Sequence, residues 1–245
     1  FAVIGQLRSE LLKQRSTQTT LLLFLSMFGL VAFAVAMHVL ALGEDQLSTR
    51  ADQLSVFQVG TRAGMLFAGL AGAIAITAEI RYGTIRPTFL VTPRRGPVIA
   101  AKLAVSGLVG IVFGLLAELL MTGAAIVGFA ARGIDNELTG GDYLQLLSGG
   151  ALAAAFWAAA GVGVGAIIRN QVGAVIGLTA WMFIVESVSE GFVPGAARFM
   201  PGGNGLALAG NSDELSAAVG ALLLVVYAAA FAAAGWLATL RRDIA

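Results

Sequence analysis

Residues 21–42 read Leu21-Leu-Leu-Phe-Leu-Ser-Met-Phe-Gly-Leu-Val-Ala-Phe-Ala-Val-Ala-Met-His-Val-Leu-Ala-Leu42, an apolar run without a formal charge. Because about 20 apolar residues in a helix cross the hydrocarbon core of a bilayer, this run predicts a transmembrane helix. Five further runs of this kind follow, at residues 56–78, 98–131, 144–168, 172–188 and 217–240. The third is long enough to tilt or to project into water, and the fifth is short.

The runs are continuous and rich in Ala, Leu and Gly, without the alternation of a membrane β-barrel, so they favour helices. We therefore expect an all-α, polytopic membrane protein with six transmembrane helices, organised as a single transmembrane domain over residues 1–245. Composition agrees, since 58% of the residues are hydrophobic and 12% are charged, and the mean hydropathy is +0.87. Soluble domains carry about 25% charged residues, so the soluble globular class is excluded.

The sequence contains no Cys and one His, His38. This excludes disulfides and thiolate metal sites and argues against a His-ligated metal, so no metal site is expected. The chain also lacks a Gly-x-Ser-x-Gly elbow, and an intramembrane enzyme is improbable. No catalytic residue is therefore assigned.

The cations predict the orientation, because positively charged loops stay in the cytoplasm. With the N-terminus inside, eleven cations lie on the inner side: Arg8, Lys13, Arg15, Arg81, Arg86, Arg94, Arg95, Lys102, Arg169, Arg241 and Arg242. Four lie on the outer side: Arg50, Arg62, Arg132 and Arg198. We expect a multi-pass protein of the plasma or inner membrane with both termini in the cytoplasm.

The N-terminal segment, residues 4–18, has apolar residues at helical spacing opposite basic ones. The apolar set is Ile4, Leu7, Leu11 and Leu12, and the basic set is Arg8, Lys13 and Arg15. This pattern predicts an amphipathic helix along the inner membrane surface, with an ordinary basic flank of the first span as the other reading. Because the first residue is Phe and not Met, we expect the native chain to start earlier.

The inner loop between the second and third spans combines cations with apolar anchors. Ile85 and Phe89 are spaced to share one face of a short helix, and Leu90 adds to it. Thr84 can cap this helix, and Gly83 permits a sharp turn out of the second span. Such an element favours a helix-in-groove contact with a cytoplasmic partner, whereas the other reading is a loop that only determines topology.

The stretch Glu79-Ile-Arg-Tyr-Gly-Thr-Ile-Arg-Pro-Thr-Phe-Leu-Val-Thr-Pro-Arg-Arg95 closely resembles the inner-loop signature of ABC-2-type permeases, the membrane subunits of ATP-binding-cassette exporters. In that signature an acidic residue ends the second span and a Lys begins the third, a place that Lys102 fits. The resemblance implies that segment 84–92 is a coupling helix that docks into a separate ATPase. The residues assigned to this contact are Glu79, Arg81, Tyr82, Gly83, Thr84, Ile85, Arg86, Phe89, Leu90, Pro93, Arg94 and Arg95.

The resemblance also implies a pair of permease subunits, identical or different, with two ATPase copies and alternating access. The only lysines are Lys13 and Lys102, and neither belongs to a phosphate-binding Gly-x-x-x-x-Gly-Lys-Ser/Thr loop. ATP and Mg²⁺ are therefore expected on the partner, with no cofactor on this chain and no nucleic acid as partner. The resemblance implies export, and the apolar spans favour a lipophilic or amphiphilic compound as the cargo, whether drug, antibiotic, lipid or peptide.

Two acids fall within the spans, Glu118 and Glu186. A charge at mid-bilayer costs at least about 2.5–3.5 kcal/mol, so such residues usually face protein or water. They are candidates for the translocation pathway, and Glu118 supports an alternative function, proton-coupled secondary transport. The other reading is a structural, hydrogen-bonded acid.

The outer segment 191–205 is rich in Gly and Pro and precedes the sixth span. It predicts short re-entrant or surface helices, and the resemblance supports an outer gate there. The candidate gate residues are Phe192, Pro194, Phe199 and Pro201. The three tryptophans, Trp157, Trp181 and Trp236, are read as packing or lipid-contact residues.

Overall fold

The structure is a computed structural model that describes residues 2–41, 43, 47–85, 87, 95–212 and 215–241. These residues are predominantly helical, and no strand occurs among them. The α-helices are α1 (Ala2–Ser16), α2 (Gln18–Ala41), α3 (Arg50–Arg81), α5 (Arg95–Arg132), α6 (Gly140–Ile168), α7 (Gln171–Ala180), α8 (Glu186–Phe192), α9 (Pro201–Leu208) and α10 (Ala217–Arg241). A π-helical turn, η2 (Trp181–Val185), joins α7 to α8, and a 3-10 turn, η3 (Ala196–Phe199), precedes α9.

The described residues include six helices long and apolar enough to cross a membrane. They cover Gln18–His38, Arg50–Arg81, Gly96–Arg132, Gly140–Ile168, Gln171–Phe192 and Ala217–Thr239. The all-helical class and the six spans are thus confirmed. The fifth span is longer than predicted, because the helix continues through η2 into α8 and past the polar residues Ser189 and Glu190 to Phe192.

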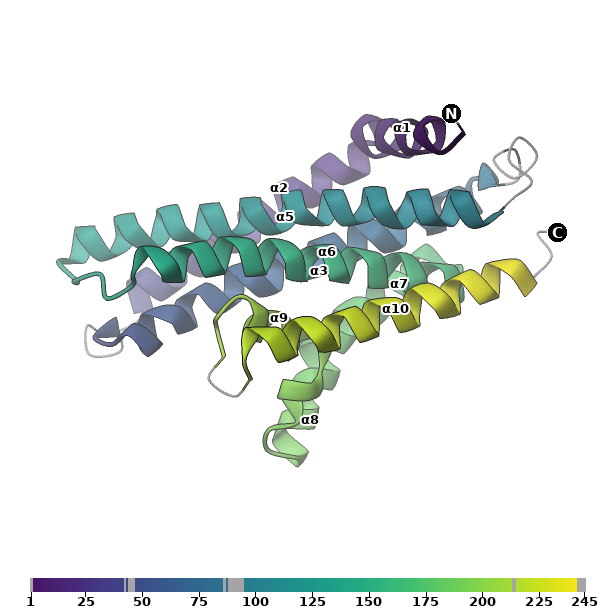
Figure 1. Cartoon of the computed structure of the whole chain (residues 1–245). Helices are drawn as coiled ribbons and strands as arrows, with labels where there is room; N and C mark the ends of the chain where they lie inside the picture. The colour runs from purple at the N-terminus through teal and green to yellow at the C-terminus, as the bar shows by residue number, and fades with distance from the viewer. Residues whose placement is uncertain are drawn as a thin grey trace.

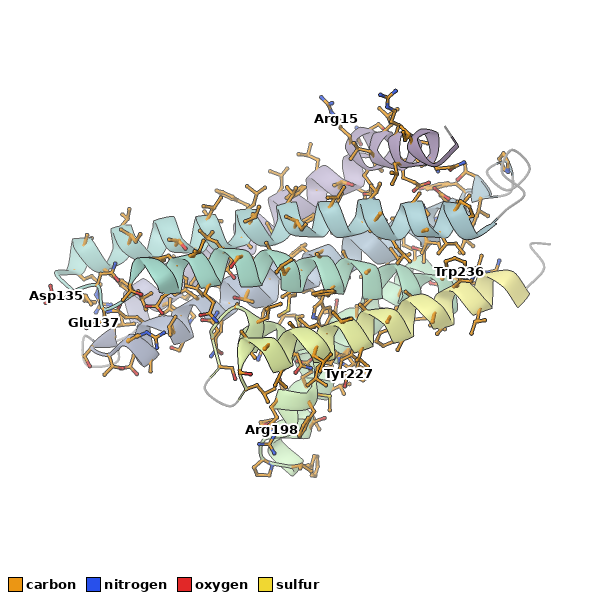
Figure 2. All side chains as sticks on the ribbon, in the orientation of Figure 1. Arg15, Asp135, Glu137, Arg198, Tyr227 and Trp236 are labelled. Carbon is orange, nitrogen blue, oxygen red and sulfur yellow. The ribbon has the colours of Figure 1, made fainter. Side chains whose placement is uncertain are left out.

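The long helices lie side by side, and α1 lies beside α5 near one end of the bundle (Figure 1). The end of α3, the start of α5 and the end of α10 lie at this same end, which we call the α1 end. Asp135 and Glu137 mark the opposite end, the far end, and α8 projects away from the bundle (Figures 1 and 2). Both termini of the described chain are therefore on one side, as six crossings require.

The centre of the bundle is the packing of α3, α5 and α6, which approach closely through small residues. A Cβ atom at Gly114 of α5 would lie 2.6 Å from the carbonyl oxygen of Gly150 on α6. A Cβ atom at Gly165 of α6 would lie 2.7 Å from the carbonyl oxygen of Ala73 on α3. Glycine permits such backbone contact, which stabilises membrane helices where lipid offers no hydrophobic drive.

Helix α1 covers nearly the same residues as the helix predicted over 4–18, and it packs against α5. Its Glu10 is buried, whereas Ile4, Leu11 and Leu12 are exposed. Of the four predicted apolar side chains, only Leu7 is half-buried, next to Pro97 and Ala100 of α5. At the far end, α3 and α6 each begin with a capping box, Thr49 with Asp52 and Thr139 with Asp142.

Candidate functional site

Four ionised side chains from three helices meet at the α1 end. Lys102 of α5 donates to Glu10 Oε2 at 2.6 Å and to Glu79 Oε1 at 3.0 Å. Lys13 of α1 donates to the same two acids, to Glu10 Oε1 at 2.7 Å and to Glu79 Oε1 at 2.8 Å. Each lysine thus bridges both carboxylates. We call Glu10, Lys13, Glu79 and Lys102 the ion cluster.

The ion cluster is largely removed from solvent. Glu10 is 2% exposed, Lys102 is 3% and Glu79 is 8%, whereas Lys13 is half-buried. Two acids and two bases balance, and Lys102 gains a third acceptor in the carbonyl oxygen of Ala75 at 3.0 Å. Buried charges are tolerated when they are paired and hydrogen-bonded, and removal of one partner leaves the others uncompensated.

The surroundings of Lys13 favour its charged form. Burial alone would lower the pKa of this amine, but the hydrogen bonds and negative charges of Glu10 and Glu79 outweigh burial and raise the pKa above 10.5. Lys13 therefore remains a cation at neutral pH.

The ion cluster lies next to both ends of the segment that connects α3 to α5. Glu79 is two residues before Arg81, where α3 ends, and Lys102 is in the second turn of α5. A pocket of about 370 Å³ adjoins the cluster and is also lined by Thr17, Tyr82 and Thr84. A force applied to this segment would therefore reach α1, α3 and α5 through the same four side chains.

The described part of the predicted coupling segment contains a turn and one buried anchor. Gly83 has φ +70, the left-handed conformation that favours glycine, so the predicted sharp turn is present. Tyr82 is exposed, and the Arg81 guanidinium lies 5.5 Å from its ring centre. Ile85 is buried within its own chain, near Ile80 and Ala238.

Most of the predicted coupling segment lies outside the described residues. Arg86, Phe89, Leu90, Pro93 and Arg94 lie outside the described residues. Arg95 begins α5, and Thr84 is exposed in the turn that follows α3. The coupling helix over residues 84–92 thus stays a prediction.

The two intramembrane acids lie in different networks. Thr61 donates through its hydroxyl to Glu118 Oε1 at 2.5 Å and accepts from the amide of Asn211 at 3.0 Å. Glu118 is fully buried, and no cationic nitrogen of the described residues lies within 4.0 Å of it. This chain of hydrogen bonds joins α3, α5 and the connection between α9 and α10.

Glu186 has different neighbours from those of Glu118. Its Oε1 accepts from the backbone N–H of Gly202 at 2.8 Å, and its Oε2 lies 3.9 Å from Arg62. The acid therefore ties the start of α8 to the start of α9. The structure does not bring Glu118 and Glu186 into one hydrogen-bonded relay among its described contacts.

The candidate gate residues divide into two groups. Pro201 is buried as the first residue of α9, where proline suits a helix start. Phe192 and Phe199 are exposed, as is Pro194, and Arg198 stacks on the Phe199 ring at 4.8 Å. The segment contains η3 and α9, and the re-entrant or surface placement of these helices stays a prediction.

Sequence reasoning placed Glu79 and Lys102 in a signature but missed Glu10 as their partner. The sequence gives little indication of this contact, because 92 residues separate Glu10 from Lys102. The spacing of Glu10 and Lys13 does indicate a pair on one helix face, and their nitrogen and oxygen lie 2.7 Å apart.

Residues 6–186 match the family model for the ABC-2 family transporter protein. This match covers well over half of the chain and includes the whole ion cluster. The chain belongs to the ABC-2 transporter family. A comparison with curated proteins finds no match. As an ABC-2 family member the chain is a membrane transport component and not itself catalytic, and the family implies an ABC ATPase as partner.

Proposed function

We propose that this ABC-2 family chain is the permease subunit of an exporter, with the α1 end in the cytoplasm. The orientation is supported by the excess of cations on that side of the six spans, since cytoplasmic loops carry more Lys and Arg. Exposed Ile4, Leu11 and Leu12 on α1 suit a helix whose apolar side chains enter the membrane surface.

One observation carries the proposal: the ion cluster lies next to both ends of the segment that connects α3 to α5. In the proposed mechanism this segment docks into an ATPase, which moves it when the ATPase dimer closes. The ion cluster makes α1, α3 and α5 respond together, because each lysine holds both acids. The bundle then alternates between inward-open and outward-open states.

The energy source is assigned to the partner. The chain has two lysines, Lys13 and Lys102, and both are committed to the ion cluster instead of a phosphate loop. ATP and Mg²⁺ thus belong to the ATPase, in two copies, and a second permease, identical or different, completes the path. The cargo is a lipophilic or amphiphilic compound, with drug, antibiotic, lipid and hydrophobic peptide as the classes.

Proton-coupled transport through Glu118 is the alternative function. Its support is the burial of this acid without a cation among the described residues. Against it stands the tight enclosure of the side chain, because a Cβ atom at Gly150 would lie 2.6 Å from Glu118 Oε1. Such packing suits a structural acid that joins α5 to α6 and to Thr61.

Co-purification of the ATPase tests the proposal. Wild-type chain should retain the ATPase, whereas Phe89→Asp and Gly83→Pro should lose it and lose ATP-dependent export. Phe192→Asp is the matched control for ATPase retention alone, since Phe192 is 83% exposed at the end of α8, away from the segment, and is itself a candidate gate residue. Export that continues without the ATPase and stops only in Glu118→Gln would establish proton coupling instead.

A further inference from the structure

The pocket of about 370 Å³ that adjoins the ion cluster has a polar end and an apolar end. Lys13 and Gln14 of α1 line the polar end, together with Thr17, where the chain passes from α1 to α2. Leu23 of α2 and Ile74 of α3 line the apolar end. A molecule that fills this space must therefore be amphiphilic.

The change from polar to apolar follows the depth along the spans. The candidate span that contains α2 begins at Gln18, and that of α3 ends at Arg81. At 1.5 Å per residue, Leu23 lies about 8 Å and Ile74 about 10 Å inside these ends. Lys13 lies before the first span, on α1. The pocket thus reaches from the level of a membrane surface into the hydrocarbon region, as a lipid with its headgroup at the surface does.

Two nitrogen atoms at the polar end keep hydrogen-bond capacity. The Lys13 ammonium has three N–H groups, of which two bind Glu10 and Glu79, and the described residues supply no third acceptor. The Gln14 amide oxygen accepts from Thr20 Oγ1 at 3.2 Å, which leaves the amide nitrogen for a ligand. Lys13 and Gln14 are both half-buried and both line the pocket, so a ligand can reach them.

The accessible charge at the polar end is positive. The Lys13 side chain is 39% exposed, whereas those of its partners Glu10 and Glu79 are 2% and 10% exposed. Arg8 and Arg15 of α1 are exposed as well, and Glu10 is the one acid of that helix. Exposed cations at a membrane surface attract anionic lipid headgroups, so the charge selects an anionic amphiphile.

The geometry points to a binding site for an anionic phospholipid. Its phosphate oxygens accept from Lys13 Nζ and Gln14 Nε2, and the first part of one acyl chain packs on Leu23 and Ile74. Because about 370 Å³ is less than the volume of a whole phospholipid, the rest of the chains lies in the bilayer. The assignment of this lipid to the cytoplasmic leaflet rests on the proposed function, whereas its binding does not.

Native mass spectrometry of the purified, delipidated chain measures this binding. The probes are palmitoyl-oleoyl phosphatidylglycerol, which is anionic, and phosphatidylcholine with the same chains, which is zwitterionic. We expect one phosphatidylglycerol to bind about fivefold more tightly than phosphatidylcholine, because the choline cation is repelled by the cations of α1. Glycerol 3-phosphate, which has the phosphate without acyl chains, should not displace it at equal concentration.

Three substitutions in the pocket and two outside it locate the lipid. Gln14→Leu removes one donor without changing the ion cluster and should weaken phosphatidylglycerol binding about fivefold, the worth of one net hydrogen bond. Ile74→Trp should weaken it at least about tenfold by filling the apolar end, whereas Leu22→Trp, at an exposed position of α2, should leave it unchanged. Lys13→Met should remove the preference for phosphatidylglycerol, and Arg15→Met, whose side chain points away from the bundle (Figure 2), should keep it.

Size-exclusion profiles and melting temperatures show whether each variant is folded, and the Gln14→Leu result stands without Lys13→Met and Ile74→Trp. Equal affinity for the two lipids would overturn the inference, as would phosphatidylglycerol binding that Gln14→Leu does not weaken. Displacement by glycerol 3-phosphate would show a site for a free anion and would also overturn it. Because no ATPase is present in these measurements, their failure is distinct from failure of the proposed coupling.

Discussion

Glu79 and Glu118 are both acids buried in the bundle, and they are stabilised in opposite ways. Glu79 meets two lysines, Lys13 and Lys102, within 3.0 Å. Glu118 meets the hydroxyl of Thr61 and no described cation within 4.0 Å. The first is part of a balanced ionic joint between helices, and the second is a hydrogen-bonded acid in neutral surroundings. We therefore expect the joint to be sensitive to loss of a charge and the neutral site to tolerate replacement by an amide.

Lys102→Met should have the largest effect. It removes a buried cation and leaves Glu10 and Glu79 with Lys13 alone, at a cost of about 3–5 kcal/mol. The apparent melting temperature in detergent, followed by tryptophan fluorescence, should fall markedly. Arg50→Met at the exposed far-end pair with Asp142 is the control and should cost about 0–1 kcal/mol. Equal effects of the two substitutions would show that the ion cluster contributes no more to stability than the Arg50–Asp142 pair.

A double-mutant cycle sharpens the comparison. Glu10→Gln combined with Lys102→Met should destabilise the chain less than the sum of the single changes, by about 1–3 kcal/mol, because the two side chains are in contact at 2.6 Å. The cycle of Glu118→Gln with Lys102→Met should be additive, since these residues share no partner. Chemical unfolding of the four variants in each cycle measures both terms. Additivity of the first cycle would rule out a direct ionic joint.

Alkaline pH should weaken the cluster modestly. The pKa of Lys13 is raised in the folded chain, so its stabilising effect is complete below 10.5 and is lost as pH rises through the higher folded value. The difference in melting temperature between wild type and Lys13→Met should therefore shrink above about pH 10.5. A difference that stays constant up to strongly alkaline pH would argue against the role of the Lys13 charge.

Glu118→Gln should have the smallest effect. The amide oxygen of Gln can still accept from Thr61, so we expect less than about 1 kcal/mol of destabilisation and export within about twofold of wild type in the assembled transporter. Glu118→Ala, which removes the acceptor, is the informative companion and should lower the melting temperature more. Complete loss of export in Glu118→Gln with an intact melting temperature would favour the proton-coupled alternative.

The spans were predictable because each contains a long apolar run, and apolar side chains in lipid require helices. The end of the fifth span was not, since the helix continues past residue 188 through Ser189 and Glu190, whose polarity hides it from a hydropathy argument. Glu79 and Lys102 could be singled out by their signature, but their contact with Glu10 depends on how α1 crosses the bundle.

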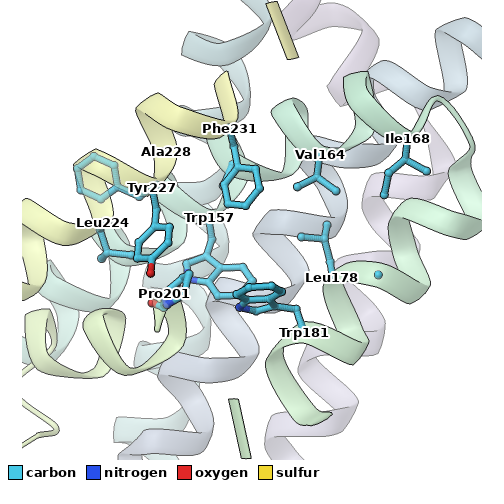
Figure 3. A pocket seen from close by; sticks show the side chains of 13 residues that line it. Trp157, Val164, Ile168, Leu178, Trp181, Pro201, Leu224, Tyr227, Ala228 and Phe231 are labelled. Carbon is cyan, nitrogen blue, oxygen red and sulfur yellow. Dashed lines mark hydrogen bonds between the residues drawn. The ribbon is translucent and has the colours of Figure 1, made fainter. Parts of the chain in front are cut away.

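No sequence signal indicated the cavity of about 230 Å³ that Trp157, Trp181 and Phe231 line (Figure 3). Its wall comes from four elements between Phe156 and Phe231, and no motif links Trp157 with Trp181. Apolar side chains in a membrane protein read equally well as packing, lipid contact or ligand contact. Only their convergence in space, and the engagement of their polar atoms, separates these roles.

Site-specific crosslinking tests most directly the central claim that the segment between α3 and α5 contacts an ATPase. The chain has no Cys, so Thr84→Cys, at an exposed position in the turn, can carry a single photoreactive maleimide. Glu137→Cys at the far end is the matched control (Figure 2). We predict that the ATPase subunit crosslinks to position 84 and not to position 137. An ATPase that crosslinks at 137, or that is bound without contact at 84, would contradict the account.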